Sequence, residues 1–236
     1  MLNTIKQIKQ LIAYKNSGNY GDFAILKSEL LGAKVDSEVT SKLEPVMGYH
    51  PYIDLEELSK YPQDTFGREY ADYMRENHLK PFNISPELED VAKRNVFALR
   101  YIATHDIFHL LLGFDTSYAG EIGVLAFAAT QNYSKSLKYS LWLAKFLYPI
   151  IAPQQRKAIF INVQKGIELG KRVQFLLGYR FEEHWKEPIK KLRNQLGLPE
   201  VVMSILEGFD SIPPTPLMKG GFKPPFSRGD GGIKTG

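Results

Sequence analysis

The sequence of 236 residues contains no cysteine, and this absence excludes several kinds of site. A chain without thiols forms no disulfide, binds no iron–sulfur cluster and has no cysteine nucleophile. A transition-metal site would therefore have to be built from histidine and carboxylate side chains. The absence of cysteine also fits a reducing compartment.

Long hydrophobic runs are absent as well. The longest strongly apolar runs, 108–114 and 122–129, are less than half of the roughly 20 residues that cross a bilayer. The first 16 residues have neither the apolar centre of a secretory signal nor the arginine-rich composition of a transit peptide. We therefore interpret them as the first helix of the mature protein.

Net charge is small, with 30 Lys and Arg against 26 Asp and Glu, which gives +4. Two of these positive charges belong to residues 209–236, so that residues 1–208 carry only +2. Nucleic-acid binding needs basic side chains clustered on one face. The charge balance therefore predicts no nucleic-acid partner.

The last 28 residues differ from the rest of the chain, because 209–236 contain six glycines and five prolines. Such a segment cannot bury enough apolar surface to offset the entropy lost on ordering. We predict one helical domain over 1–208 and a flexible tail over 209–236.

Apolar residues recur at helical spacing almost everywhere, and no run shows the alternation or the β-branched density of a strand. The class predicted is all-α, a multi-helix bundle with helices separated by short connections. Helices are expected over 1–16, 21–31, 36–42, 64–79, 86–112, 116–147, 153–177, 180–196 and 199–207, with mostly loop over 45–63 and one short turn near 55–59.

The segment YIATHDIFHLLLGF, residues 101–114, carries the strongest chemical signal. His105 and His109 are four residues apart on one helical face, a spacing by which a helix presents two imidazoles to one metal ion. Asp106 is the only formal charge in this apolar segment, and a buried carboxylate requires a partner. Asp106 is either a metal ligand or a group that orients a ligand.

Glu121 is the expected fourth member of the site. A stop at Gly113 and a restart near Thr116 predict two antiparallel helices joined by a short turn. His109 then lies about 6 Å below the turn and Glu121 about 7–8 Å below it on the partner helix, at roughly 1.5 Å per residue. The alternative interpretations are buried structural histidines and a glutamate that merely favours the helix dipole.

Two motifs resemble a known family. Residues 105–121 are similar to the HDxxHxLLGxxTxxxGE signature of the coenzyme Q biosynthesis protein 4 family, and residues 181–197 resemble its YExxWxxxLxxLRxxLG helix. The resemblance covers roughly residues 86–200. It implies an all-helical protein of ubiquinone biosynthesis in which His105, Asp106, His109 and Glu121 hold a metal ion.

The resemblance also implies a function. Members of the family are described as lipid-binding organisers of biosynthetic proteins and as catalysts of oxidative decarboxylation at C1 of a polyprenylated benzoate ring. We expect a metal-dependent decarboxylase with one divalent cation, zinc before magnesium, manganese or iron. The alternative is a non-enzymatic isoprenoid-binding scaffold for other quinone-biosynthesis proteins.

Further residues complete these expectations. Arg100, between one and two turns before His105, is a candidate for an anionic substrate group, or else a member of an intrahelical or surface ion pair. The small residues of 116–129 favour either close packing or a channel for a prenyl tail. Lys135, Lys138 and Lys145, with Trp142 and Phe146, can rest on lipid headgroups or form a solvated face.

Location and assembly are the remaining expectations. Without a transit segment, a bacterial, cytoplasmic protein is expected, peripheral on the inner face of the membrane, with a homodimer left open. A third hypothesis is a helical metal phosphohydrolase, for which His78 is the candidate upstream ligand, although no Asp follows Asp115 before Asp210.

Overall fold

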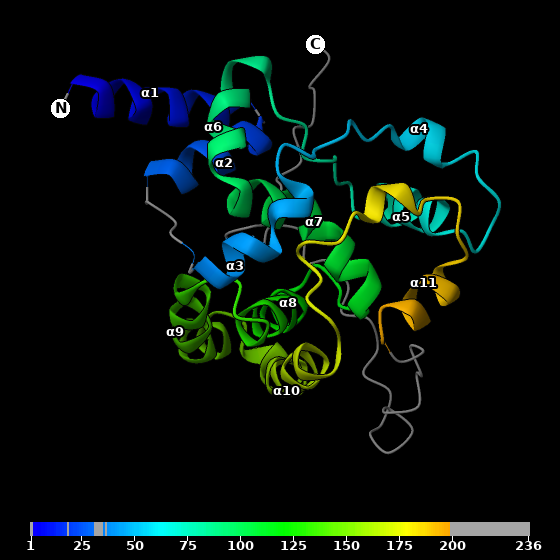
Figure 1. The fold of residues 1–236 in the computed structure, drawn as a ribbon. Helices are drawn as coiled ribbons and strands as arrows, with labels where there is room; N and C mark the ends of the chain where they lie inside the picture. Colours follow the sequence, from blue (N-terminus) through cyan, green and yellow to red (C-terminus); the bar gives the residue numbers. More distant parts are fainter. Residues whose placement is uncertain (1, 18, 31–34, 36, 199–236) are drawn as a thin grey trace, which may run out of the picture.

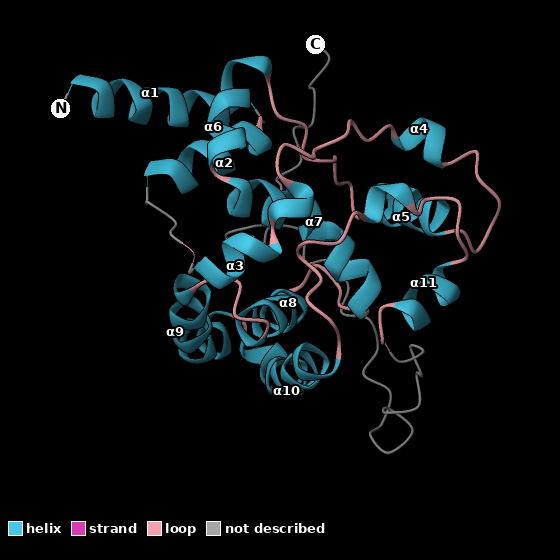
Figure 2. Cartoon of the chain, viewed as in Figure 1, coloured by secondary structure: helices cyan, strands magenta, loops and turns pink. Residues whose placement is uncertain are grey.

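Helices account for all the regular structure in the computed structural model, which describes residues 2–17, 19–30, 35 and 37–198 (Figures 1 and 2). The predicted all-α class is confirmed. Residues 199–207 and 209–236 lie outside the described residues, so the last helix, the tail and the domain boundary stay predictions. The α-helices are α1 (Leu2–Ser17), α2 (Tyr20–Leu30), α3 (Ser37–Lys42), α4 (Leu55–Leu58), α5 (Phe66–Glu76), α6 (Glu89–Arg94), α7 (Val96–Leu112), α8 (Tyr118–Thr130), α9 (Lys135–Ile151), α10 (Arg156–Arg172) and α11 (Ile189–Gln195), with 3-10 turns η1 (Glu44–Val46), η2 (Pro86–Leu88), η3 (Pro153–Gln155) and η4 (Phe181–Glu183).

Helix α8 is the centre of the packing, with α10 along one side and α9 and α7 against others (Figure 1). Gly166 allows α10 to approach α8 closely. A Cβ at this position would overlap the carbonyl oxygen of Gly123 and lie 3.0 Å from the Cβ of Ala126. Between α8 and α10, the small residues therefore serve close packing.

Two hydrophobic clusters meet at α8. The larger contains Phe108 of α7, Phe127 of α8 and Phe181 of η4, with ring centroids 5.6 and 6.0 Å from that of Phe108. The smaller joins α8, α9 and α10 and includes Tyr118 and Tyr148. Because α8 contributes to both clusters, polar groups in its first turns lie in largely apolar surroundings.

Two long predicted helices are broken by short polar side chains. The prediction over 86–112 is wrong at Asn95, whose side chain accepts a hydrogen bond from the Ala98 N–H at 3.1 Å and begins α7. The prediction over 116–147 is wrong at Asn132, which is left-handed with φ of 58°, and at Ser134, which caps α9. Asn and Ser compete with helical hydrogen bonds in this way.

The predicted helices over 153–177 and 180–196 are also too long. α10 ends at Arg172, and 180–196 contains only η4 and α11. The N–H groups of Phe66 and Gly67 donate to the carbonyls of Glu187 and Trp185, each at 2.8 Å. Residues 184–188 thus hydrogen-bond to the start of α5 instead of forming a helix.

Candidate metal centre

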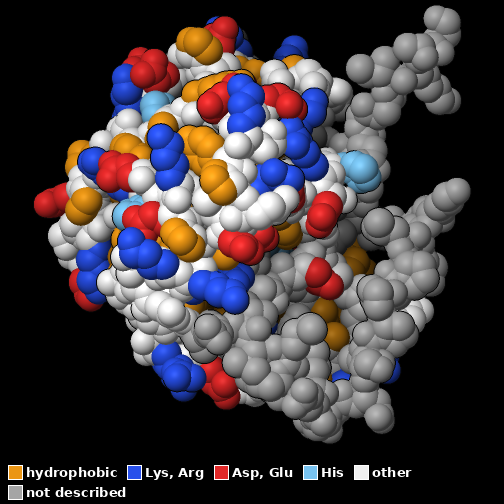
Figure 3. Space-filling view, turned by 90° about the vertical axis from the view of Figure 1, so that its right-hand side faces the viewer, with side chains coloured by type: hydrophobic (Ala, Val, Ile, Leu, Met, Phe, Trp, Pro, Cys, Tyr) orange, Lys and Arg blue, Asp and Glu red, His pale blue; other side chains and the backbone are white. Residues whose placement is uncertain are grey.

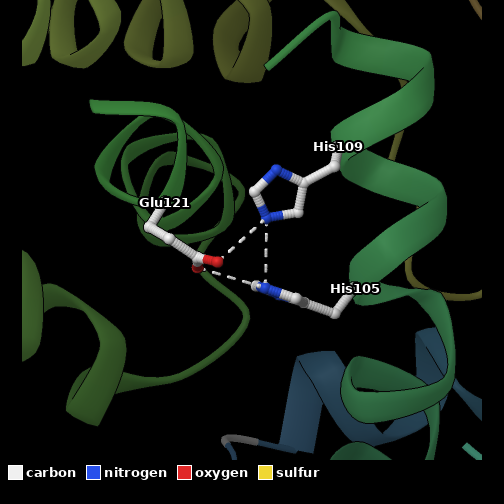
Figure 4. A group of neighbouring side chains, drawn as sticks. All are labelled: His105, His109 and Glu121. Atoms are coloured by element: carbon white, nitrogen blue, oxygen red, sulfur yellow. Dashed lines mark hydrogen bonds and ion pairs between the residues drawn. The ribbon is translucent and has the colours of Figure 1, made fainter. Parts of the chain in front are cut away.

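The two histidines of α7 face one another. α7 ends at Gly113, which adopts the left-handed conformation (φ 68°, ψ 47°) and closes the last turn, as its sequence predicted. His105 and His109 are one turn apart on the same face, and their Nε2 atoms lie 3.3 Å from each other (Figure 4).

The first turn of α8 brings Glu121 to these rings. The Ser117 side chain accepts a hydrogen bond from the Gly120 N–H at 3.3 Å, which places Glu121 just inside the helix start. Its Oε2 lies 3.3 Å from His105 Nε2 and its Oε1 lies 3.5 Å from His109 Nε2 (Figure 4). Three of the four predicted ligands are therefore together.

The relative direction of α7 and α8 differs from that of the predicted antiparallel hairpin. The connection after Gly113 is short, but α7 runs along the page in Figure 4 while α8 is seen close to end-on, so the helices cross steeply rather than antiparallel. The direction of α8 is set by its packing on α10. Glu121 still reaches the imidazoles, because it is in the turn of α8 nearest to α7.

The donor atoms have the spacing that a small cation needs. One atom from each of the three side chains lies within 4.8 Å of the others. A tetrahedral cation with bonds of about 2.0–2.1 Å has ligand atoms about 3.3–3.4 Å apart. The Nε2–Nε2 separation of 3.3 Å matches one edge of such a tetrahedron, and each carboxylate oxygen of Glu121 lies at a comparable distance, 3.3 or 3.5 Å, from one imidazole nitrogen.

Electrostatics favour positive charge inside this triangle. Burial alone would raise the pKa of Glu121, but hydrogen bonds from His105 and His109 and their charges outweigh it, and the pKa falls well below its usual value. Burial alone would lower the pKa of His109, but Glu121 and then Asp106 raise it. Facing imidazole lone pairs and a buried carboxylate are stable together only around a proton or a cation.

Hydrogen bonds at the C-terminal end of α7 hold the candidate ligands in place. His109 Nδ1 donates to the carbonyl oxygen of Phe114 at 3.3 Å, an arrangement that leaves Nε2 as the lone-pair donor. Arg193 donates to the carbonyls of Leu110 and Leu111. Lys165 donates to that of Gly113 at 3.2 Å. The end of α7 is thus fixed by hydrogen bonds from α10 and α11.

Asp106 lies outside the three-residue group. The residue is 8% exposed, and its charge contributes to raising the pKa of both His109 and Tyr73. The choice between ligand and orienting group therefore stays open, with the orienting role favoured by its position one residue from His105.

Tyrosines around the site were not predicted. The Tyr101 ring contacts that of His105 edge-on at 5.9 Å, and helical spacing of 101, 105 and 109 was the signal for it. The Tyr73 hydroxyl of α5 is buried without a hydrogen-bond partner in the described part of the chain, and burial, then Asp106 and Glu121, raise its pKa. No local pattern pointed to Tyr73.

Arg100 is not part of the group. It is fully buried, and its guanidinium binds the Glu182 carboxylate at 2.8 Å and the Tyr179 carbonyl at 2.8 Å. Trp185 of the same segment stacks on Phe66 at 4.6 Å. The glutamate and tryptophan of the second motif thus make structural contacts.

Fold and site together define an all-helical protein with a candidate two-histidine, one-carboxylate metal centre between α7 and α8. The family model described as coenzyme Q (ubiquinone) biosynthesis protein Coq4 matches residues 44–201, and the chain belongs to this family. The match includes every residue of the candidate centre.

Relatives in animals support the assignment. The chain is 29% identical over 153 residues to the mitochondrial ubiquinone biosynthesis protein COQ4 homolog of Xenopus tropicalis, covering 63% of this chain and 54% of the relative. Identity is 30% over 151 residues for Bos taurus (63% and 56%) and 28% over 156 residues for Homo sapiens (65% and 57%). The chain thus spans about half the length of these relatives.

A solved structure shares the fold. It is a protein from Nostoc punctiforme that was provisionally assigned to ubiquinone biosynthesis, with a TM-score of 0.59 and 23% identity. The likeness covers 83% of this chain and 98% of that one. At this identity it supports the helical architecture alone.

Proposed function

We propose that this protein acts in the biosynthesis of a ubiquinone-type prenylquinone, as a metal-dependent decarboxylase of a polyprenylated hydroxybenzoate. The observation that carries the proposal is the triangle of His105, His109 and Glu121 in a member of this family. Replacing the C1 carboxylate by hydroxyl releases carbon dioxide, consumes one water and transfers two electrons to an external acceptor. The reaction therefore needs an oxidant as second substrate.

The three side chains would hold one divalent cation. Two imidazoles and a carboxylate favour zinc, also suit manganese and iron, and suit magnesium least. When bound there, the cation supplies a Lewis acid that polarises the substrate carboxylate. His109 is kept in the correct tautomer by Phe114, so that the ligand geometry is set before substrate arrives.

Tyr73 is the proposed hydrogen-bond donor to an anionic oxygen of the substrate. Its raised pKa keeps the phenolic proton on Oη at neutral pH, and its hydroxyl has no partner among the described residues. A neutral donor beside two buried carboxylates stabilises negative charge that develops on the ring. In this proposal, Tyr73 keeps its phenolic proton and donates it in a hydrogen bond to the anionic oxygen of the substrate.

The prenyl tail is proposed to lie along the apolar contact of α8 with α9. The hydrophobic cluster at this contact includes Ala119 of α8 and Ala144 of α9, and Ala119 is two residues from Glu121. A cavity of about 260 Å³ near Gln131 lies at the opposite end of α8 and has a polar lining, which does not suit an isoprenoid.

The second candidate is a non-enzymatic isoprenoid-binding scaffold that recruits other quinone-biosynthesis proteins, as a monomer or a homodimer. The exposed apolar side chains of α9, such as Trp142 and Phe146, favour it, because they offer a lipid or protein contact. Native mass spectrometry that finds bound isoprenoid, together with no turnover of a prenyl-hydroxybenzoate, would support this candidate.

The position of His78 does not support the phosphohydrolase hypothesis. His78 is exposed and is not among the described residues that gather around His105 and His109. A prenyl phosphate assay distinguishes this activity from the other two.

The test combines metal analysis with turnover. The purified chain is expected to bind about one divalent metal, and His105→Ala plus His109→Ala is expected to abolish both metal binding and release of labelled carbon dioxide from a C1-labelled prenyl-hydroxybenzoate. His50→Ala is the matched control, because His50 lies outside the group. Equal metal content in the double variant and wild type would refute the centre.

A further inference from the structure

We propose that the outward face of α9 docks the protein on an anionic lipid surface. Along this helix, large apolar side chains are turned to solvent. Trp142 is 57% exposed, Phe146 59% and Ile150 71%. The docking face is defined by Tyr139, Trp142, Leu143, Phe146, Leu147 and Ile150.

The spacing of these residues makes a continuous stripe. Positions 139, 142, 143, 146, 147 and 150 follow the three- and four-residue repeat of one helical face. Leu141, Ala144 and Tyr148 occupy the other face and are buried against α8 and α10. The ring of Trp142 lies 6.0 Å from that of Tyr139 and 5.3 Å from that of Phe146. A surface patch of this kind marks an interaction site.

The charge of the segment that contains α9 indicates which kind of partner fits the docking face. No Asp or Glu occurs between Glu121 and Glu168, whereas this segment contains six cations: Lys135, Lys138, Lys145, Arg156, Lys157 and Lys165. With a total charge of +4, the remainder of the chain carries 4 − 6 = −2. The helix with the most exposed large hydrophobic side chains therefore lies within a long segment that has cations and no acidic residue, and it complements an anionic surface.

The opposite side of the molecule has a different character. Figure 3 shows the side of the molecule that lies on the right in Figure 1, away from α9, and there basic and acidic side chains alternate with scattered apolar ones. Such a mixture is typical of an ordinary solvated surface. This side therefore lacks the combination of exposed apolar and exclusively basic side chains that the α9 segment shows.

A lipid surface suits the face better than a second copy does. A two-fold contact through α9 would bring Lys138 and Lys145 of both copies together, with no acidic residue in the segment to neutralise them. Trp and Tyr are favoured where one side of a ring is apolar and the other meets headgroups. None of the described helices is long and apolar enough to cross a bilayer, so α9 is expected to lie in the plane of the interface.

The inward face of the same helix packs against α8, the helix that carries Glu121. The ring of Tyr148 packs edge-on against Tyr118 of α8 at 5.1 Å. Burial and then the charge of Glu121 raise the pKa of Tyr148 to about 12, so that Tyr148 lies within the electrostatic range of that carboxylate. A protein docked through α9 therefore has its site one helix away from the lipid, where a polyprenylated substrate would reside.

Vesicle flotation with the full chain tests the docking. Wild type is expected to bind vesicles of equal parts phosphatidylglycerol and phosphatidylcholine about tenfold more tightly than pure phosphatidylcholine, with binding reduced by high salt. Trp142→Ser plus Phe146→Ser is expected to weaken binding about tenfold by removing apolar contact. Tyr52→Ser is the matched control, because Tyr52 is 77% exposed outside the face.

The charge is tested separately by reversal. Lys138→Glu plus Lys145→Glu is expected to abolish the preference for phosphatidylglycerol, whereas Lys80→Glu plus Lys190→Glu makes the same change in net charge away from α9 and is expected to leave the preference intact. Circular dichroism checks that each variant stays folded.

Two outcomes would overturn the proposal. One is equal flotation of wild type and the Trp142, Phe146 double variant. The other is a stable dimer, measured by light scattering, that this variant converts to monomer while neither form binds vesicles. Docking requires neither metal nor substrate, so its failure is distinguishable from failure of the proposed reaction.

Discussion

Arg100 and Glu182 form an ion pair buried almost completely in the protein, although 82 residues separate them in the chain. The guanidinium is 0% exposed and the glutamate side chain 3%, with Arg100 Nη1 and Glu182 Oε1 2.8 Å apart. The pair joins the start of α7 to η4. It therefore links the helix that carries the two histidines to the C-terminal part of the described chain.

Removing Glu182 should strongly destabilise the protein. Glu182→Ala leaves the Arg100 charge buried without its partner, and we expect a loss of about 3–5 kcal/mol in the free energy of unfolding, measured by urea denaturation. Glu183→Ala is the control, because its exposed pair with Arg180 contributes at most about 1 kcal/mol. Similar losses in the two variants would contradict the structural role of the buried pair.

The α8–α10 contact should tolerate no side chain at Gly166. An alanine there overlaps the carbonyl oxygen of Gly123, so the helices must separate, and we expect a loss of about 1–3 kcal/mol. Alanine at an exposed helical site is instead expected to stabilise slightly, and Ser140→Ala in α9 provides this comparison. Thermal unfolding measures both, and a Gly166→Ala variant as stable as wild type would show that the contact is looser than described.

Asp106→Asn should distinguish its two candidate roles. If Asp106 orients the ligands, the variant keeps one metal per chain and its affinity falls about 10–100-fold. If Asp106 is itself a ligand, the loss is as severe as in Glu121→Gln. Competition of a fluorescent chelator with the protein for zinc measures both affinities, and wild-type affinity in Asp106→Asn would exclude both roles.

Alkaline pH should unfold the protein through tyrosines whose pKa is raised in the folded state. Burial, then the charges of Glu182 and Glu183, raise the pKa of Tyr49 from 10.0 to about 12, and burial raises that of Tyr133 further. Between pH 10 and 12 the unfolded chain has lost protons that the native chain keeps, so stability decreases as pH rises.

Tyrosinate absorbance and circular dichroism, recorded together, measure this effect. In general, a tyrosine in contact with solvent ionises near pH 10 without loss of structure. Tyr49 and Tyr133, whose pKa is raised in the folded protein, should ionise only as helicity is lost. Ionisation of all 13 tyrosines near pH 10, without unfolding, would contradict the prediction.

Local sequence was sufficient for the elements whose signals are short-range. Apolar spacing predicted the helical class, Gly113 predicted the end of α7, and the interval of four placed His105 and His109 on one face. Each of these depends on backbone geometry within one or two turns, which neighbouring residues decide.

Tertiary packing decided the rest. The crossing of α7 and α8 and the partner of Arg100 depend on segments distant in the chain. No spacing in the sequence reports that Glu182 will neutralise Arg100, or that Tyr73 of α5 will lie within the field of Asp106 and Glu121. Helices form from local hydrogen bonds, whereas buried charges and close backbone contacts are matched only when the whole core is assembled.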